Sequence, residues 1–249
     1  MSSFIYEPIN TLKQLGEDIW ICDGDVVHMD MKVCKVPFPT RMVVLKLSNG
    51  ELFVHSPINL TDSLAAQIKS LGNVKYIVAP NKIHYTYIKQ WADYFKGISV
   101  YAVEGIKERA KDQNIPVKID EVLTHDSFSE LSEDLDYCLF KGSSFMDEAV
   151  FNHKKSKTLI VVDLIENFEK EKIGLFKYLI FKIVGITAPN GKAPKDLRLT
   201  FKNGGTSARK SLSVIKEWSF DKIVMAHGKI VKENARYFFK RSFSWVDKI

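Results

Sequence analysis

The sequence predicts an α+β protein in which two mixed β-sheets lie between outer helices, a four-layer αββα sandwich made of two similar halves. Each half of the 249-residue chain begins with short apolar runs that follow one another as hairpin strands do. Each half then alternates between helical patterns and buried strands, and such helices pack on the outer faces of sheets. No stretch has the composition of a linker, so we expect residues 1–249 to form a single domain.

The first half contains five apolar runs of strand length. Asn49-Gly50 is a strong hairpin-turn signal between two of them. The run VKYIVA predicts a buried strand that must end at Pro80, which cannot continue a central ladder. Residues 25–40, which include two prolines, are expected to be irregular. The strands are expected at residues 17–22, 41–47, 52–55, 74–79 and 98–103. The helices are expected after an N-cap at Thr61 or Asp62, through Trp91 and Phe95, and at residues 104–111.

The second half repeats this style. Residues 187–205 contain two prolines and three glycines, so we expect a loop-rich segment there. The strands are expected at residues 135–140, 149–153, 158–163 and 222–226. The helices are expected at residues 166–186, 207–218 and 231–247.

The composition is that of a globular protein that can bury a core, with 45% hydrophobic and 27% charged residues. The three cysteines form no CxxC pair, which argues against a disulfide framework or a structural zinc knuckle. The first twenty residues lack the pattern of a signal peptide. These features favour a reducing, cytoplasmic compartment.

The net charge is +6, and much of the lysine excess lies beyond residue 150. Such charge is typical of a solvated face or of a surface for an anionic partner. No nucleic-acid-binding signature accompanies it. The most apolar segment, residues 173–186, is shorter than the roughly 20 residues that a membrane span needs. Lys177 and Lys182 are spaced so that they spread around a helix, which argues against a membrane-surface helix. We therefore expect a partly buried helix or a lid over a pocket; nothing indicates the oligomeric state.

Polar side chains of metal-ligand type stand at the ends of several predicted strands. Asn81 and His84 follow the strand VKYIVA, Asp163 ends the strand TLIVVD, and His227 follows the strand KIVMA. Glu148 stands just before the strand AVFNH. Strand ends at one edge of a sheet share a crevice, and His, Asp, Glu and Asn side chains bind metal ions. These five residues are therefore candidate metal ligands, whereas no motif identifies a catalytic residue or an organic cofactor site.

Each candidate also has a purely structural interpretation, and the residues alone leave both open. Asp163 could cap a following helix, His227 could be a core histidine, Asn81 could bond its own turn, His84 could lie in a first helical turn, and Glu148 could be a solvated turn carboxylate.

Four segments, in this order, resemble the metallo-β-lactamase fold superfamily: EDIWICDG, YIVAPNKIHYTYIKQW, SKTLIVVDLIENF and WSFDKIVMAHG. The resemblance covers nearly the whole chain and is closest to the branch grouped as the domain of unknown function DUF4336. It implies an αββα sandwich with a one- or two-metal site at the sheet edge, usually of zinc or iron, that activates a water.

The resemblance also implies where the ligands should lie, and here the chain departs from the superfamily. Its HxHxDH signature falls on residues 80–85, and none of the four ligands is kept. Pro80 and Lys82 replace the first two histidines, His84 replaces the aspartate, and Tyr85 replaces the last histidine.

Elsewhere the agreement is better. Asp163 matches the bridging aspartate of a later Gly-Asp motif, with Val162 in place of the glycine, and His227 matches the last metal-binding histidine. Glu148 lies near the position of another histidine ligand.

Two hypotheses follow. A two-metal site holds its ions about 3.5–4 Å apart and needs several ligands for each, so the lost ligands favour a single zinc, iron or manganese ion. The first hypothesis is a metallo-β-lactamase-like hydrolase with a remodelled, mononuclear site and an unknown small-molecule substrate. Basic residues of the loop after Ile186 would favour an anionic one: Lys192, Lys195, Arg198 and Lys202. The second is a metal-free pseudoenzyme of the same fold that binds a ligand or partner.

Overall fold

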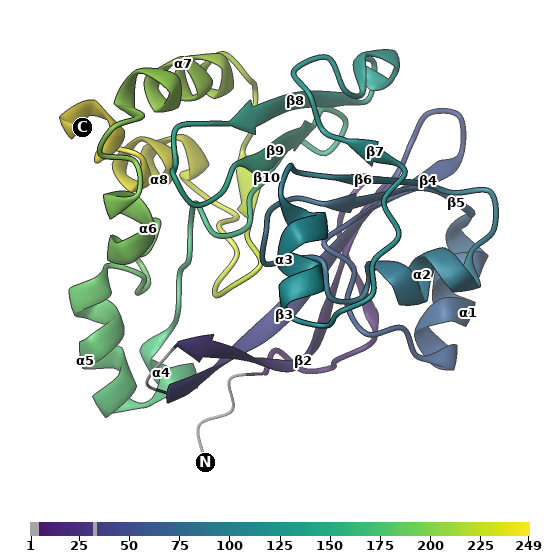
Figure 1. Ribbon diagram of the computed structural model, residues 1–249, viewed down its shortest axis with the longest axis horizontal. Coiled ribbons are helices and arrows are strands. Elements are labelled where there is room, and N and C mark those ends of the chain that lie inside the picture. Colours follow the sequence, from purple (N-terminus) through teal and green to yellow (C-terminus); the bar gives the residue numbers. More distant parts are fainter. Residues whose placement is uncertain (1–4, 32–33) are drawn as a thin grey trace. The chain divides into compact units, whose positions relative to one another are not determined.

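The computed structural model describes residues 5–31 and 34–249 and leaves out the side chains of residues 28–37, Cys34 among them. Its contacts divide the chain into two compact units, Met1–Val122 and Leu123–Ile249. Each unit contains one sheet and several helices (Figure 1). Whether these two units form a single domain, as the sequence predicts, stays a prediction.

The first unit is built on a seven-stranded sheet in the order β1-β2-β3-β4-β5-β6-β7. β1 to β4 pair antiparallel, and β4 to β7 pair parallel. The helices α1 and α2 pack against β5, and the Thr61 side chain caps α1 by accepting the Leu64 N–H at 3.2 Å. The strands are β1 (Leu12–Gly16), β2 (Ile19–Met31), β3 (Cys34–Lys46), β4 (Glu51–His55), β5 (Asn73–Ala79), β6 (Ser99–Ala102) and β7 (Glu121–Val122). The helices are α1 (Asp62–Leu71), α2 (Ile88–Tyr94) and α3 (Ile106–Asp112).

The sequence predicts that residues 25–40 are irregular. Residues 32–33 lie outside the described part of the chain, and for the other residues the prediction is wrong, because they lie in strands. β2 and β3 form a hairpin of two 13-residue strands. Pro37 and Pro39 pair with residues of β2. β4 pairs only with residues 43–46 of β3, so the prolines lie where β3 is an edge strand and their missing N–H groups cost no ladder bond.

The second unit is built on a four-stranded sheet in the order β11-β10-β9-β8. β10 pairs antiparallel with β9 and parallel with β11, and α7 packs against β8 (Figure 1). The strands are β8 (Leu135–Phe140), β9 (Glu148–His153), β10 (Thr158–Ile160) and β11 (Lys222–Val224). The α-helices are α4 (Lys170–Ile173), α5 (Leu175–Val184), α6 (Lys195–Leu199), α7 (Gly205–Lys216) and α8 (Ala235–Ser242). Two short 3₁₀ helices are η1 (Ser129–Leu131) and η2 (Val246–Lys248).

Two predictions for this unit need correction. The expected helix at residues 166–186 begins only at Lys170 and breaks at Gly174, whose φ of +74° is a left-handed value that favours glycine. Residues 166–168 instead form single bridges to three loop segments. The segment 187–205, expected to be loop, contains the short helix α6 directly after Pro194, a position where a proline costs no helical hydrogen bond.

The apolar segment forms the ten-residue helix α5. Phe181 is its buried side chain, whereas five large apolar side chains of the helix are exposed: Leu175, Phe176, Leu179, Ile180 and Ile183. α5 is therefore partly buried, as expected, and its exposed side is apolar; a role as a lid over a pocket stays a prediction. Among the residues that the structure describes, no helix has both the length and the apolar character to cross a membrane.

Candidate functional site

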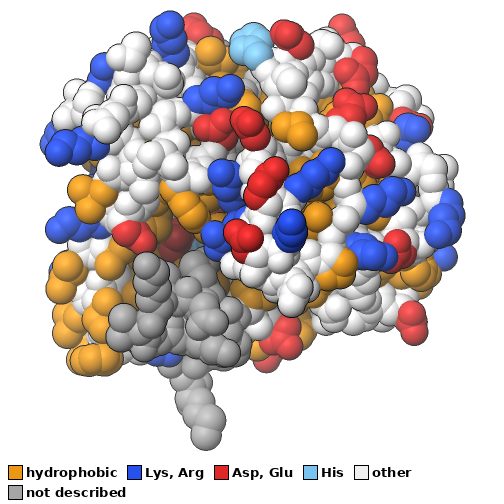
Figure 2. All heavy atoms as spheres, viewed as in Figure 1, with side chains coloured by type: hydrophobic (Ala, Val, Ile, Leu, Met, Phe, Trp, Pro, Cys, Tyr) orange, Lys and Arg blue, Asp and Glu red, His pale blue; other side chains and the backbone are white. Residues whose placement is uncertain are grey.

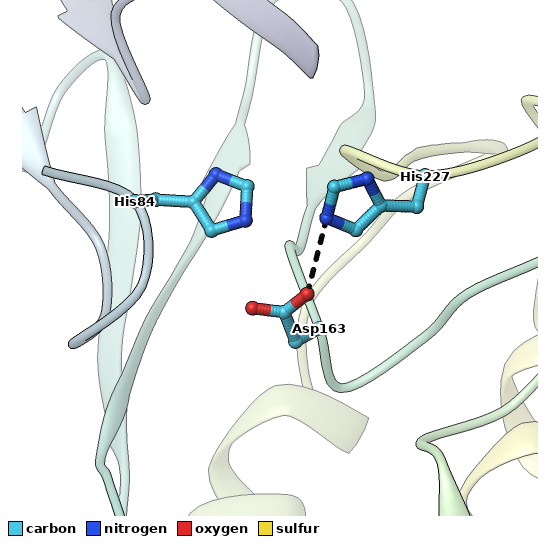
Figure 3. A group of neighbouring side chains, drawn as sticks. All are labelled: His84, Asp163 and His227. Atoms are coloured by element: carbon cyan, nitrogen blue, oxygen red, sulfur yellow. Dashed lines mark ion pairs between the residues drawn. The ribbon is translucent and has the colours of Figure 1, made fainter. Parts of the chain in front are cut away.

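Asp163 and His227 meet at the carboxyl ends of two neighbouring parallel strands. β10 and β11 pair in register through Ile160 and Val224, so the chain places residues 163 and 227 three positions beyond the same rung. His227 Nε2 lies 3.3 Å from Asp163 Oδ1 (Figure 3). Both side chains are buried. A carboxylate and an imidazole buried face to face are a pair that can bind a cation.

Glu148 holds the backbone that carries Asp163. Its Oε2 accepts the N–H of Asp163 at 2.8 Å and that of Leu164 at 3.2 Å. Its Oε1 accepts the N–H of Val162 at 2.8 Å. Glu148 is buried at the start of β9, so it is not a solvated turn carboxylate. These three N–H bonds assign Glu148 a positioning contact with the backbone of Asp163.

The His227 backbone is held by the segment after Asp163. The Asn167 N–H donates to the His227 carbonyl at 3.0 Å, and the Lys229 N–H donates to the Asn167 carbonyl at 2.8 Å. Gly228 has a φ of +103°, and a Cβ there would lie 2.3 Å from Asn167 backbone atoms. Only glycine allows this approach. The Phe168 ring lies nearly parallel to the His227 ring, with an interplanar angle of 14° and centroids 6.4 Å apart.

Glu166 adds a second buried carboxyl group to this part of the unit. Burial raises its pKa well above the usual value, and the nearby carboxylates of Asp163, Asp196 and Glu148 raise it further. Its Oε2 is buried without a hydrogen-bond partner among the described residues. Glu166 therefore favours its neutral, protonated form next to Asp163.

In the first unit, Asn81 shapes the turn that carries His84. Its Oδ1 accepts the N–H of Ile83 at 2.9 Å and that of His84 at 3.1 Å. This is the turn interpretation of Asn81, in which a short polar side chain bonds its own backbone. α2 begins only at Ile88, so His84 lies in the turn and not in the first turn of a helix.

Ser56 orients the His84 ring, and the sequence interpretation missed it. Ser56 Oγ lies 2.8 Å from His84 Nδ1, so Nε2 is the ring atom that would bind a metal. Ser56 directly follows β4, its N–H donates to the Val78 carbonyl at 2.9 Å, and its φ is +54°. It stands at a strand end, as the five predicted residues do, and this position was the signal that could have identified it.

Two of the four positions that replace the HxHxDH ligands have structural roles. The Lys82 side chain lies over Gly105, where its Cε would be 2.4 Å from an added Cβ. Tyr85 is buried, and its hydroxyl donates to Gln113 Oε1. Lys82 and Tyr85 thus pack against the protein where the signature would place ligands, whereas His84 in the same turn has a side chain of metal-ligand type.

The Asp163–His227 pair fits a metal ion in its donor chemistry and spacing. Zinc takes imidazole nitrogen and carboxylate oxygen at about 2.0–2.2 Å, and two such ligands in a tetrahedron lie about 3.4 Å apart. The observed separation is 3.3 Å. Direct charge-assisted hydrogen bonds from nitrogen are shorter, about 2.7–2.9 Å. Asp163 does not cap a helix, because the next helix begins at Lys170.

Comparison with known proteins identifies the fold. A family model described as "Domain of unknown function (DUF4336)" matches residues 17–184. No functionally curated protein matches the chain.

Several solved structures match nearly the whole chain. The DIM-1 metallo-β-lactamase is 17% identical with a TM-score of 0.63, and 96% of each chain is covered. The mono-zinc form of the metallo-β-lactamase FIM-1 from Pseudomonas aeruginosa is 12% identical with a TM-score of 0.61, covering 96% of this chain and 95% of that one. The Flv1 flavodiiron core from Synechocystis sp. PCC6803 is 10% identical with a TM-score of 0.61, covering 95% of this chain and 60% of that one. The predicted α+β fold of the metallo-β-lactamase type is confirmed.

Proposed function

The chain belongs to the DUF4336 family, and on this premise we propose that it is a hydrolase of the metallo-β-lactamase fold with a remodelled site for one metal ion. The observation that carries the proposal is the Asp163–His227 pair, whose ligand atoms lie at the separation of two ligands of one ion. The similar structures include a mono-zinc metallo-β-lactamase and a flavodiiron core. Zinc or iron therefore suits the proposed site, and manganese is kept as a third option because it also binds carboxylate ligands.

We assign Asp163 and His227 to the ion, and His84 stays the third ligand that the sequence predicts. Asp163 supplies the negative charge, and His227 and His84 supply Nε2 atoms. Ser56 holds His84 through Nδ1, and such contacts fix the ring orientation of metal-binding histidines. When bound, the ion supplies Lewis-acid chemistry that polarises the scissile group and acidifies a water.

Glu148 and Asn81 take positioning roles in this proposal. Glu148 accepts three N–H groups around Asp163, and Asn81 accepts two N–H groups at the His84 turn. Their oxygens are engaged with the backbone, so the ion would be held by the residues that they orient. The prediction that Glu148 and Asn81 bind the ion directly stays open to test, by measuring the metal affinity of variants at each position.

An anionic small molecule is the substrate class that we propose. Lys192 and Arg198 both lie against Gly185, at 3.2 Å and 3.3 Å from the position of a Cβ there. Burial lowers the pKa of Lys192, and the neighbouring cations of Arg198, Lys248 and Arg241 lower it further. The Lys192 carbonyl accepts the Glu166 N–H at 3.2 Å, which ties this positive cluster to the segment that follows Asp163. A substrate carboxylate or phosphate would relieve the repulsion between these cations.

The test is metal content and affinity, measured on protein purified without a chelating tag. We expect about one equivalent of metal in the wild type by elemental analysis, and its loss in Asp163→Ala and His227→Ala. His125 and Asp126 offer a matched control, because they form an exposed His–Asp pair at 3.1 Å. Replacing both by alanine should leave the metal content unchanged. A wild type without bound metal, and without thermal stabilisation by zinc, iron or manganese, would overturn the proposal.

A metal-free pseudoenzyme is the second candidate, and the lost HxHxDH ligands favour it. In that case Asp163 and His227 form an ion pair that only stabilises the fold. Lys82 and Tyr85 then serve packing at positions where the superfamily has metal ligands. A panel of chromogenic esters and amides, with and without carboxylate or phosphate groups, separates the two. Metal-dependent turnover that disappears in Asp163→Ala supports the hydrolase, and ligand binding without metal or turnover supports the pseudoenzyme.

A further inference from the structure

α5 presents an apolar face to solvent that the metal site does not explain. Its five outward apolar side chains are between 46% and 77% exposed, and Phe176 and Ile183 are the most exposed of them. Exposed apolar residues scattered singly are normal in proteins, whereas a contiguous apolar patch marks an interaction surface. Figure 2 shows hydrophobic side chains gathered at the place that α5 occupies in Figure 1.

The five positions form one continuous face. At about 100° per residue, residues 175, 176, 179, 180 and 183 cover an arc of about 140° around the helix. The opposite side of the helix carries Phe181, which is buried and packs edge-on against Phe168 with ring centroids 5.0 Å apart. α5 is therefore anchored by one side, and its other side is apolar and unburied.

Lysines border this apolar face on both sides. In the same projection Lys177 lies about 60° beyond one border of the arc and Lys182 about 20° before the other, and both are exposed. The five-residue spacing, which in the sequence argues against a membrane-surface helix, is what puts one lysine on each border. Long lysine side chains at such borders keep the ammonium in water while their stems cover apolar surface.

The surrounding chain is positive as well. Residues 169–202 contain eight Lys and Arg residues and three Asp and Glu residues, an excess of five positive charges. Arg198 and Lys192 lie at the C-terminal end of α5, where Arg198 donates to the Val184 carbonyl at 3.3 Å. A positive field around an apolar face complements a surface that is both apolar and anionic.

We propose that α5 is an interfacial helix that docks on an anionic lipid surface, with its apolar face in the headgroup–acyl boundary and its lysines at the phosphates. The helix has ten residues, which at 1.5 Å per residue is about 15 Å, half the hydrocarbon thickness of a bilayer. It would therefore lie in the interface. This inference uses none of the proposed metal ligands.

The test is sedimentation of the full chain with vesicles of phosphatidylcholine alone and of phosphatidylcholine mixed with phosphatidylserine. We expect binding to the mixed vesicles that weakens as salt is added. Phe176→Glu with Ile183→Glu, and separately Lys177→Glu with Lys182→Glu, should each weaken binding at least about tenfold. Val214→Glu and Lys210→Glu on α7 are matched controls, because Val214 is also an exposed apolar side chain, and they should bind as the wild type does.

Far-ultraviolet circular dichroism and thermal melts check that each variant folds. A Phe176→Trp variant gives a second readout, since lipids brominated on their acyl chains should quench the added fluorescence. Three outcomes overturn the proposal. The first is a wild type that stays in the supernatant with both vesicle types. The second is binding that the α5 variants leave unchanged. The third is self-association that disappears in Phe176→Glu with Ile183→Glu, without vesicle binding, which would assign the face to a second copy of the chain.

Discussion

Glu148 Oε2 accepts the backbone N–H of Asp163 at 2.8 Å, although the two residues are fifteen positions apart in the chain. This contact joins the start of β9 to the loop after β10. It holds the backbone of Asp163 and leaves the Asp163 carboxylate out of the contact. Two carboxylates therefore lie close together for different reasons: Asp163 is the candidate metal ligand, and Glu148 holds its backbone.

Glu148→Ala should lower the free energy of unfolding by about 3 kcal/mol or more, because it leaves three buried N–H groups without an acceptor. Glu148→Gln keeps one acceptor oxygen and should cost less. Urea unfolding measures both. Glu130→Ala, an exposed carboxylate on η1, is the control and should stay within about 0.5 kcal/mol of the wild type. Equal stabilities of Glu148→Ala and the control would contradict the positioning role.

Ser56→Ala and Ser56→Gly both remove the hydroxyl at His84 Nδ1, so each should weaken metal binding by about 10–100-fold. The two should differ in stability. Ser56 has a φ of +54°, which costs a residue with a Cβ about 1 kcal/mol relative to glycine. Titration calorimetry gives the affinities and thermal melts give the stabilities. Unchanged affinity in both variants would remove Ser56 from the site.

Gly228→Ala should destabilise the protein by at least about 3 kcal/mol, because the added Cβ meets the Asn167 backbone at 2.3 Å in an unfavourable φ region. Gly97 is the matched control. Its φ is +71°, and an added Cβ there has no neighbour within 4 Å. Gly97→Ala should therefore cost only the backbone strain, about 1 kcal/mol. Comparable losses in the two variants would show that the close approach at Gly228 is not decisive.

Glu166→Gln should change how stability depends on pH. The folded-state pKa of Glu166 lies above its usual value, so above that usual value the folded protein holds a proton that the unfolded chain has lost. The contribution of Glu166 to stability therefore falls as pH rises. Glutamine does not titrate, so the stability of the variant relative to the wild type should increase with pH, by up to about 1.4 kcal/mol per unit.

Urea unfolding of metal-free protein in the presence of a chelator, between about pH 5 and pH 8, follows this difference. Glu171→Gln, an exposed carboxylate on α4, should give a curve parallel to that of the wild type. If Glu166→Gln also runs parallel to the wild type, Glu166 is ionised in the folded protein.

The sequence alone predicted the fold class and most of the strands near the candidate site. A strand such as β5 is predictable because its apolar run and Pro80 act locally. The turn role of Asn81 is equally local, since its acceptor contacts are two and three residues away. Much of the β2–β3 hairpin was missed because Pro37 and Pro39 argue against a strand in the sequence. Proline is excluded from a central strand but allowed in an edge strand. Only the pairing partners of a segment decide whether it is central or at an edge.

What the sequence determined by itself was the set of polar residues at strand ends, because residue type and local pattern place them there. Only the tertiary structure decided their roles. The register of β10 with β11 brings Asp163 next to His227. The packing of β9 places the Glu148 carboxylate at the backbone N–H of Asp163. The packing of α5 leaves its apolar side exposed. Each of these depends on contacts between residues far apart in the chain, and such contacts are set by the packing of whole sheets and helices, which no local stretch encodes.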